Sequence, residues 1–182
     1  MSWKLKKTVA LVGMMGAGKT AVGKALAARL QVPFLDSDAE IESAANMTVA
    51  EIFARDGEPF FREKESQVIQ RLLENERCIL STGGGAFMAP RNQDMISRQG
   101  VSVWLNADLD LLWNRVRHKD TRPLLRTENP YETLRGIYQA RTPVYANADL
   151  AISVQPKFSI EETASLVIDA LLTRPDVLEE IS

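Results

Sequence analysis

Gly13-Met14-Met15-Gly16-Ala17-Gly18-Lys19-Thr20 is the stretch that decides how this chain folds. It follows an apolar, strand-like segment at residues 8–12 and precedes a helical pattern at residues 21–30. In that position glycines let backbone N–H groups converge on phosphate oxygens, and the positive end of the following helix faces the same anion. Lys19 can neutralise the β- and γ-phosphates, and the Thr20 hydroxyl can bind Mg²⁺. An ordinary glycine-rich turn would not explain the Lys and Thr, so the motif predicts a nucleoside triphosphate site formed by this run and Ala21.

The composition limits the chain to one domain and to small partners. With 182 residues, of which 45% are hydrophobic, it can build one well-buried core, so residues 1–182 are expected to form a single domain. The net charge of -2 argues against a general nucleic-acid binder, which needs a basic surface. The single cysteine Cys78 and single histidine His118 exclude a disulfide framework and a structural zinc site. We therefore expect a cytoplasmic monomer that uses Mg²⁺.

The first residues resemble a signal peptide only superficially. Lys4, Lys6 and Lys7 precede an apolar stretch, but glycines and Lys19 interrupt it. An exported segment would need a longer unbroken apolar run and a cleavage site. No segment approaches the length needed to span a bilayer, so no membrane contact is expected.

Short apolar segments alternate with helical patterns along the whole chain. This order forces parallel pairing with helices on both faces of the sheet, so the fold class is α/β. The expected strands are 8–12, 33–36, 78–82, 101–105 and 150–154. Helix starts are expected at the capping-box pairs Thr48/Glu51 and Ser159/Glu162 and at Asn129. The tail is expected to fray after residue 174.

A basic segment breaks the alternation. It contains one acid, Asp120, and five cations: Arg115, Arg117, Lys119, Arg122 and Arg126. A solvated charge run is the usual explanation of such a cluster. Next to a phosphate loop we interpret it as a basic, mobile lid at about residues 115–129, because phosphoryl transfer needs cations over the γ-phosphate and the exclusion of water.

Two large classes of phosphate-loop protein do not fit. Guanine-binding switches typically carry Asn-Lys-x-Asp and Asp-x-x-Gly motifs, and transporter ATPases carry Leu-Ser-Gly-Gly-Gln. None of these motifs occurs in the chain. A small-molecule kinase remains as the main hypothesis.

Further motifs narrow that class: Asp36-Ser37-Asp38, Phe61-Arg62-Glu63-Lys64-Glu65, Gly83-Gly84-Gly85, Arg122-Pro123-Leu124-Leu125 and Arg141-Thr142-Pro143-Val144-Tyr145. Together with the phosphate loop they resemble the shikimate kinase family, from the first strand to the last helix and in the family's order. The resemblance implies a three-layer, nucleoside monophosphate kinase-like P-loop fold with a five-stranded parallel sheet of spatial order 2-3-1-4-5. It also implies transfer of the ATP γ-phosphoryl group to the 3-hydroxyl of shikimate, in chorismate and aromatic amino-acid biosynthesis.

The residues of these motifs suit such a substrate, which is a small carboxylated triol. Arg62 and Arg141 can each grip a carboxylate through two charge-assisted hydrogen bonds. Asp38 can accept the hydrogen bond or proton of the attacking hydroxyl, as a true base or only as a positioning group. Asp36, at the end of its strand, can hold Mg²⁺ beside the hydroxyl of Thr20. The substrate region is expected at about residues 37–64.

Each of these assignments has a simpler alternative. Asp36 suits a turn, and Asp38 or Ser37 can cap a helix, which is compatible with catalysis. Arg62 can form a surface ion pair with Glu65, three residues on. Arg141 is harder to explain structurally, because it shares an apolar helix face with Leu134 and therefore needs a partner.

The three adjacent glycines are the last element of the substrate site. Gly83, Gly84 and Gly85 can be a flexible turn, yet such a run sacrifices folding entropy. Close approach of a ligand to the backbone explains that cost better, with N–H groups offered to substrate oxygens.

The remaining assignments concern the nucleotide. Arg122 is expected to act on the transferring phosphoryl group, which makes Lys19, Asp38 and Arg122 the expected catalytic set. By resemblance, Arg117 stacks on adenine and Pro156 flanks its other face, with Arg115 as the substitute for Arg117.

Two rival functions stay open from the sequence. A gluconate or other small polyol kinase shares the class, although it should not need Asp38 together with the two arginines and the triple glycine. A nucleotide-binding module without turnover belongs to a different class. The combination of Lys19, Asp36, Asp38 and Arg122 argues against it.

Overall fold

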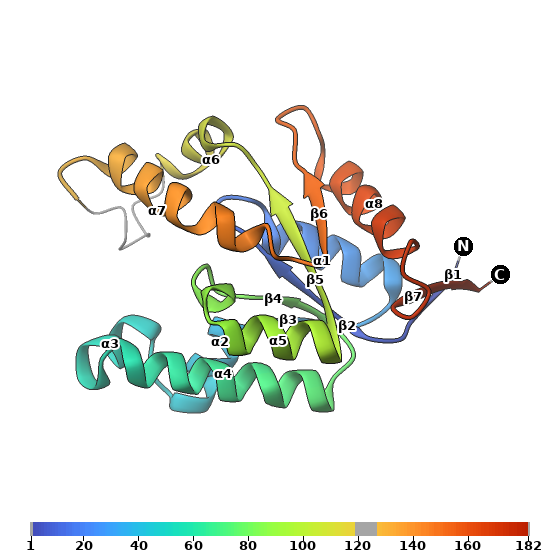
Figure 1. Ribbon diagram of the computed structural model, residues 1–182, viewed down its shortest axis with the longest axis horizontal. Helices are drawn as coiled ribbons and strands as arrows, with labels where there is room; N and C mark the ends of the chain where they lie inside the picture. Colours follow the sequence, from blue (N-terminus) through green and yellow to red (C-terminus); the bar gives the residue numbers. More distant parts are fainter. Residues whose placement is uncertain (1, 119–126, 182) are drawn as a thin grey trace.

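The computed structural model describes residues 2–118 and 127–181, and its centre is a five-stranded parallel sheet (Figure 1). The sheet order is β3 (Phe34–Asp36), β4 (Ile79–Ser81), β2 (Thr8–Val12), β5 (Gly100–Asn106) and β6 (Leu150–Ser153). Counted along the chain, these five strands have the order 2-3-1-4-5, which confirms the predicted α/β fold. The bounds differ from the predicted ones by one residue at several strand ends.

Burial explains why the short apolar runs became strands. Every residue of the central strand β2 is buried, and Val9 pairs with Ile79 on one side and with Val101 on the other. A strand covered on both faces has to be apolar throughout rather than alternating. Because all five strands are parallel, their carboxyl ends meet at one edge of the sheet, where ligands of such folds bind.

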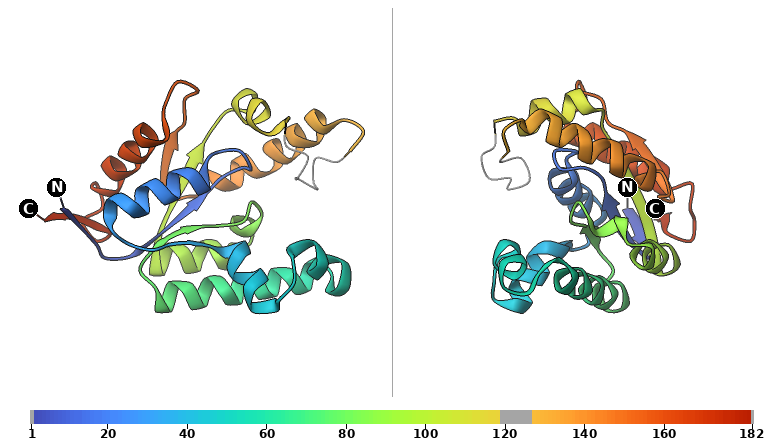
Figure 2. Two further views of the ribbon diagram at one scale, coloured as in Figure 1. Left: turned by 180° about the vertical axis from the view of Figure 1, so that it is seen from behind. Right: turned by 60° about the vertical axis from the view of Figure 1, so that its left-hand side comes forward.

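Helices cover both faces of this sheet. Helix α1 (Lys19–Leu30) lies behind the sheet in Figure 1, where it packs against α8 (Ile160–Leu171). On the opposite face, α5 (Pro90–Gln99) packs against β5 and against α4 (Glu58–Asn75). The reverse view in Figure 2 brings α1 to the front. This arrangement is the three-layer architecture expected from the alternating pattern.

The predicted helix starts are confirmed. Thr48 and Glu51 form a reciprocal capping box at α3 (Val49–Asp56), and Ser159 and Glu162 form another at α8. Asn129 accepts a hydrogen bond from Glu132 N and caps α7 (Pro130–Tyr145). Each cap satisfies a backbone N–H that the helix leaves without a partner. The remaining elements are α2 (Ser37–Ala45), α6 (Leu109–Val116) and the short 3₁₀ helix η1 (Ala86–Met88).

The prediction of a frayed tail after residue 174 is wrong. Strand β7 (Leu178–Ile181) pairs antiparallel with β1 (Ser2–Leu5) in a separate two-stranded sheet, so the two termini lie side by side (Figure 1). Val177 and Leu178 are buried, and Lys6 N donates to Val177 O at 2.7 Å. Backbone pairing and two buried side chains hold the tail in place.

Within residues 2–118 and 127–181, no helix is both long enough and apolar enough to cross a bilayer.

Candidate active site

The phosphate loop joins the carboxyl end of β2 to the N-terminus of α1. Gly16 and Gly18 have φ angles of 84° and 100°, a region that only glycine occupies readily. Lys19 Nζ donates to Gly13 O, and Ala17 N donates to Met14 O at 3.1 Å. The loop therefore folds back on itself with its N–H groups at the positive end of a helix, as anion binding requires.

A cavity of about 560 Å³ opens above this loop. Its lining includes the whole predicted run from Met14 to Ala21, with Gly13 buried beside it. The residues that line it from elsewhere in the chain are Arg115, Val154, Phe158, Ser159, Ile160 and Thr163. Sequence reasoning missed Phe158 and Ile160, which precede and begin α8 and carry no motif signal.

The two arginines considered for adenine stacking, Arg115 and Arg117, lie in different surroundings. Arg115 lies within the last turn of α6, lines the cavity and donates to Gly16 O at 2.9 Å. Arg117 follows the end of α6, is exposed and donates to His118 Nε2 at 3.1 Å. Neither Arg117 nor Pro156 lines the cavity. Arg122 falls outside the described residues.

The three adjacent glycines bring the predicted substrate residues together. A Cβ added at Gly83 would lie 2.6 Å from Asp38 Oδ1, and one added at Gly84 would lie 2.8 Å from an Arg141 guanidinium nitrogen. At Gly85 the added Cβ would lie 2.5 Å from Arg62 Nη2. Three charged side chains, from α2, α4 and α7, thus occupy the space that side chains at Gly83, Gly84 and Gly85 would need.

Asp38 lies in the first turn of α2, and it is Asp36 that caps this helix, accepting from Ala39 N at 3.0 Å. Among the described residues, Asp38 Oδ1 is buried without a hydrogen-bond partner. Burial raises the pKa of Asp38 above its ordinary value, the nearby charge of Asp36 adds to the rise, and Lys19 opposes it. Lys19 of the phosphate loop is therefore near enough to Asp38 to favour its charged form.

The ion pair between Arg62 and Glu65 is present. Arg62 Nη1 lies 3.0 and 3.2 Å from the two oxygens of Glu65, whose side chain is only 1% exposed. Burial raises the pKa of Glu65, and the adjacent Arg62 opposes that rise. Both terminal nitrogens of the guanidinium also face Gly85, since a Cβ there would lie 2.5 Å from Nη2 and 2.9 Å from Nη1, so the ion pair holds Arg62 against the glycine segment.

Thr20 and Asp36 offer a hydroxyl and a carboxylate, which are the hard oxygen ligands that Mg²⁺ prefers. Thr20 lines the cavity above the loop. Asp36 uses its Oδ1 to accept the hydrogen bond that caps α2. Across the described part of the chain, no cluster of three or more His, Cys, Asp or Glu side chains could hold a metal ion. The residues therefore fit an ion that takes its remaining ligands from water and nucleotide phosphates rather than from a protein cage.

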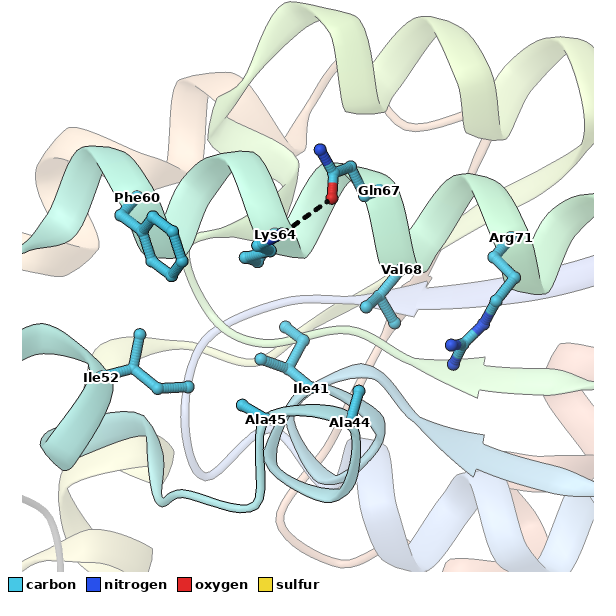
Figure 3. Close-up of a pocket in the computed structure, with 9 residues that line it drawn as sticks. All are labelled: Ile41, Ala44, Ala45, Ile52, Phe60, Lys64, Gln67, Val68 and Arg71. Atoms are coloured by element: carbon cyan, nitrogen blue, oxygen red, sulfur yellow. Dashed lines mark hydrogen bonds between the residues drawn. The ribbon is translucent and has the colours of Figure 1, made fainter. Parts of the chain in front are cut away.

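A second cavity, of about 360 Å³, lies away from these residues between α2, α3 and α4 (Figure 3). Its side chains point toward one another across a mainly apolar groove that includes Ile41, Ile52 and Val68. Several of its lining residues fall within the predicted substrate region of about residues 37–64, but none of them is one of the individually predicted site residues.

Known proteins of similar sequence belong to the family that the motifs of this chain resemble. A sequence model of the family described as shikimate kinase matches residues 15–172. A shikimate kinase of Cereibacter sphaeroides is 70% identical over 176 residues, which cover 97% of this chain and 88% of that protein. One of Ruegeria pomeroyi is 68% identical over 175 residues, covering 96% and 90%.

Solved structures support the same family. A structure described as shikimate kinase from Acinetobacter baumannii in complex with shikimate superposes with a TM-score of 0.85 at 36% identity, covering 92% of this chain and 93% of that one. With the phosphate loop, the charged cluster on the glycines and these relatives in agreement, the chain belongs to the shikimate kinase family.

Proposed function

We propose that this protein transfers the γ-phosphoryl group of ATP to the 3-hydroxyl of shikimate, giving shikimate 3-phosphate and ADP. The observation that carries the proposal is the approach of Asp38, Arg62 and Arg141 to within 2.5–2.8 Å of Cβ positions on three adjacent glycines. One acceptor and two guanidinium groups match an acid with neighbouring hydroxyls. The relative from Acinetobacter baumannii, described as a complex with shikimate, supports the same assignment.

Arg62 and Arg141 bind the substrate carboxylate in this proposal. Arg62 is already oriented by the buried Glu65, so little side-chain entropy remains to be lost when the substrate arrives. The absence of side chains at Gly84 and Gly85 lets the two guanidinium groups lie directly against the glycine backbone.

Asp38 orients the attacking hydroxyl. Its buried Oδ1 has no hydrogen-bond partner among the described residues, and a substrate hydroxyl would supply one. Because phosphoryl transfer passes through a loose transition state, accepting this hydrogen bond matters more than removing the proton early. The raised pKa of Asp38 brings its basicity closer to that required of a proton acceptor near neutral pH.

Lys19 and the phosphate-loop N–H groups hold the nucleotide phosphates, and Arg122 neutralises charge on the transferring group. Arg115 contacts the loop through Gly16 O, which favours it over Arg117 as the arginine beside the nucleotide. Thr20 and Asp36 would hold Mg²⁺, which would supply positive charge to offset that of the nucleotide phosphates.

The test is ADP release with ATP and Mg²⁺, measured with shikimate, with gluconate and without an acceptor, with Lys19→Met protein as the blank. We expect release to depend strongly on shikimate. Stimulation by gluconate alone would replace shikimate with a polyol substrate. Lack of stimulation by any acceptor would favour a nucleotide-binding module without turnover.

We also propose that the protein acts as a monomer in the cytoplasm. Light scattering should give a mass near 20.3 kDa at assay concentration. A mass near twice that value would refute the monomer.

A further inference from the structure

The glycine segment of the substrate site is held by side chains from several elements. Ser37 Oγ accepts from Gly83 N at 3.1 Å, and Tyr145 Oη donates to Gly84 O at 2.5 Å. One turn further on, Asn92 Nδ2 donates to Ala86 O at 2.8 Å. A run of three glycines that should be flexible is therefore fixed at successive backbone groups.

Tyr145 stands out because its ring is fully enclosed. It is 1% exposed, and its centroid lies 6.5 Å from that of Phe87 and 6.2 Å from that of Trp104. A phenol buried so deeply needs partners for its oxygen.

The hydroxyl of Tyr145 belongs to the glycine segment, since it donates to Gly84 O. Burial raises the pKa of Tyr145, and the nearby charge of Arg141 opposes only part of the rise, so the group is a neutral donor at physiological pH. Gly84 and Arg141 are themselves packed together, since a Cβ on Gly84 would lie 2.8 Å from the guanidinium.

We propose that Tyr145 is a positioning residue: its hydroxyl fixes the Gly84 carbonyl, and Gly84 in turn is the residue against which the Arg141 guanidinium packs, ready for the substrate carboxylate. The proposal rests on the function proposed above. It assigns Tyr145 to acceptor affinity and not to the phosphoryl-transfer step, because Gly84 and Arg141 both lie outside the phosphate loop.

The test is Tyr145→Phe, which keeps the ring and its packing against Phe87 and Trp104 and removes only the hydroxyl. We expect KM for shikimate to rise about tenfold, the effect of losing one buried hydrogen bond. KM for ATP should stay within about twofold and kcat within about threefold. Tyr138→Phe is the matched control on the same helix, and it should change none of these constants.

Two further measurements separate positioning from general loosening of the fold. In an Arg141→Gln background, Tyr145→Phe should add less than about twofold to KM for shikimate, since the residue it positions is already gone. With the methyl ester of shikimate as acceptor, which lacks the charged carboxylate, the penalty of Tyr145→Phe should also shrink to about twofold.

The outcomes that overturn the proposal differ from those that overturn the function. Equal losses in both KM values and in kcat, an unchanged KM for shikimate, or additive effects with Arg141→Gln would each exclude the positioning role. If wild-type protein failed to phosphorylate shikimate, the proposed function itself would fall.

Discussion

Two glycine-rich loops flank the same site and use glycine for different physical reasons. In the phosphate loop, Gly16 and Gly18 have positive φ angles, and a Cβ on Gly18 would meet nothing closer than 3.6 Å. In the substrate loop, none of Gly83, Gly84 and Gly85 has a positive φ, yet an added Cβ would collide with a charged side chain at each. The first loop needs glycine for backbone shape, and at Gly16 also for space, because a Cβ there would lie 2.8 Å from Val116 Cγ1. The second loop needs glycine for space alone.

This difference determines which functions a substitution should damage. Strain in the backbone misdirects N–H groups and lowers stability, because a non-glycine residue held at positive φ is costly. Crowding by a new methyl group displaces the end of a long side chain, which is cheap for the fold but moves the group that binds the substrate.

The largest expected effect comes from removing a charge rather than a glycine. Asp38→Asn should lower kcat by about 10²–10⁴-fold, because the acceptor that orients the hydroxyl is lost while the size is kept. ATP affinity, measured by titration calorimetry, should be unchanged. The exposed Asp94→Asn on α5 is the control. Near-normal turnover of Asp38→Asn would refute the role.

Gly18→Ala should come next. The strained backbone should lower kcat/KM for ATP by about 100-fold and the free energy of unfolding by about 1–2 kcal/mol. Urea unfolding and steady-state kinetics with varied ATP measure the two effects. If stability fell and ATP kinetics were normal, the loop would not depend on this conformation.

Gly85→Ala should show the opposite pattern. The new methyl group displaces Arg62, so KM for shikimate should rise about tenfold while KM for ATP stays constant. The melting temperature should stay within about 3 °C of wild type, since only the tip of a long side chain has to move. A large loss of stability would mean that space is not the reason for this glycine.

Asp38→Asn should also change stability, in a pH-dependent way. Burial raises the pKa of Asp38 above 3.8, so the folded chain binds this proton more tightly than the unfolded chain does. The ionised form therefore destabilises the fold above the raised pKa, and the destabilisation disappears below about 3.8. Asn should raise the melting temperature at pH 8 by about 2–4 °C, and the gain should shrink as pH falls toward 4. A gain that grew on acidification would contradict this assignment.

Gly136→Ala should give the smallest effect, and it serves as the reference for the other glycine substitutions. Gly136 lies inside α7, is exposed, has no positive φ, and a Cβ there would meet nothing within 4 Å. Alanine should therefore stabilise the protein by about 0.4–1 kcal/mol without changing any kinetic constant. Loss of stability would show that glycine has a role there that neither shape nor space explains.

The sequence predicted best where a local signal dominates. The phosphate loop, the apolar strands and the caps at Thr48, Asn129 and Ser159 each depend on neighbouring residues, and the structure has all of them. The sheet order came from the family resemblance, because nothing in a single strand reveals which strand will lie beside it.

The sequence failed where partners are distant. Strand β7 reads Leu178-Glu179-Glu180-Ile181, which carries little apolar signal, and its partner β1 lies at the other end of the chain. The choice between Arg115 and Arg117 depended on the residue at which α6 ends. Residue spacing predicted the ion pair between Arg62 and Glu65 on α4, but it could not show that Tyr145 on α7 donates to Gly84 O, 61 residues away in the chain.

The antiparallel pairing of β1 with β7 makes the molecule topologically close to a ring. Ser2 pairs with Ile181 at the outer end of that ribbon, so a short linker could join the two ends without crossing any other element. New ends could then be opened in a surface turn far from the phosphate loop. A circular permutant of this kind should keep the spatial order of the strands in the sheet while changing the order in which they are synthesised.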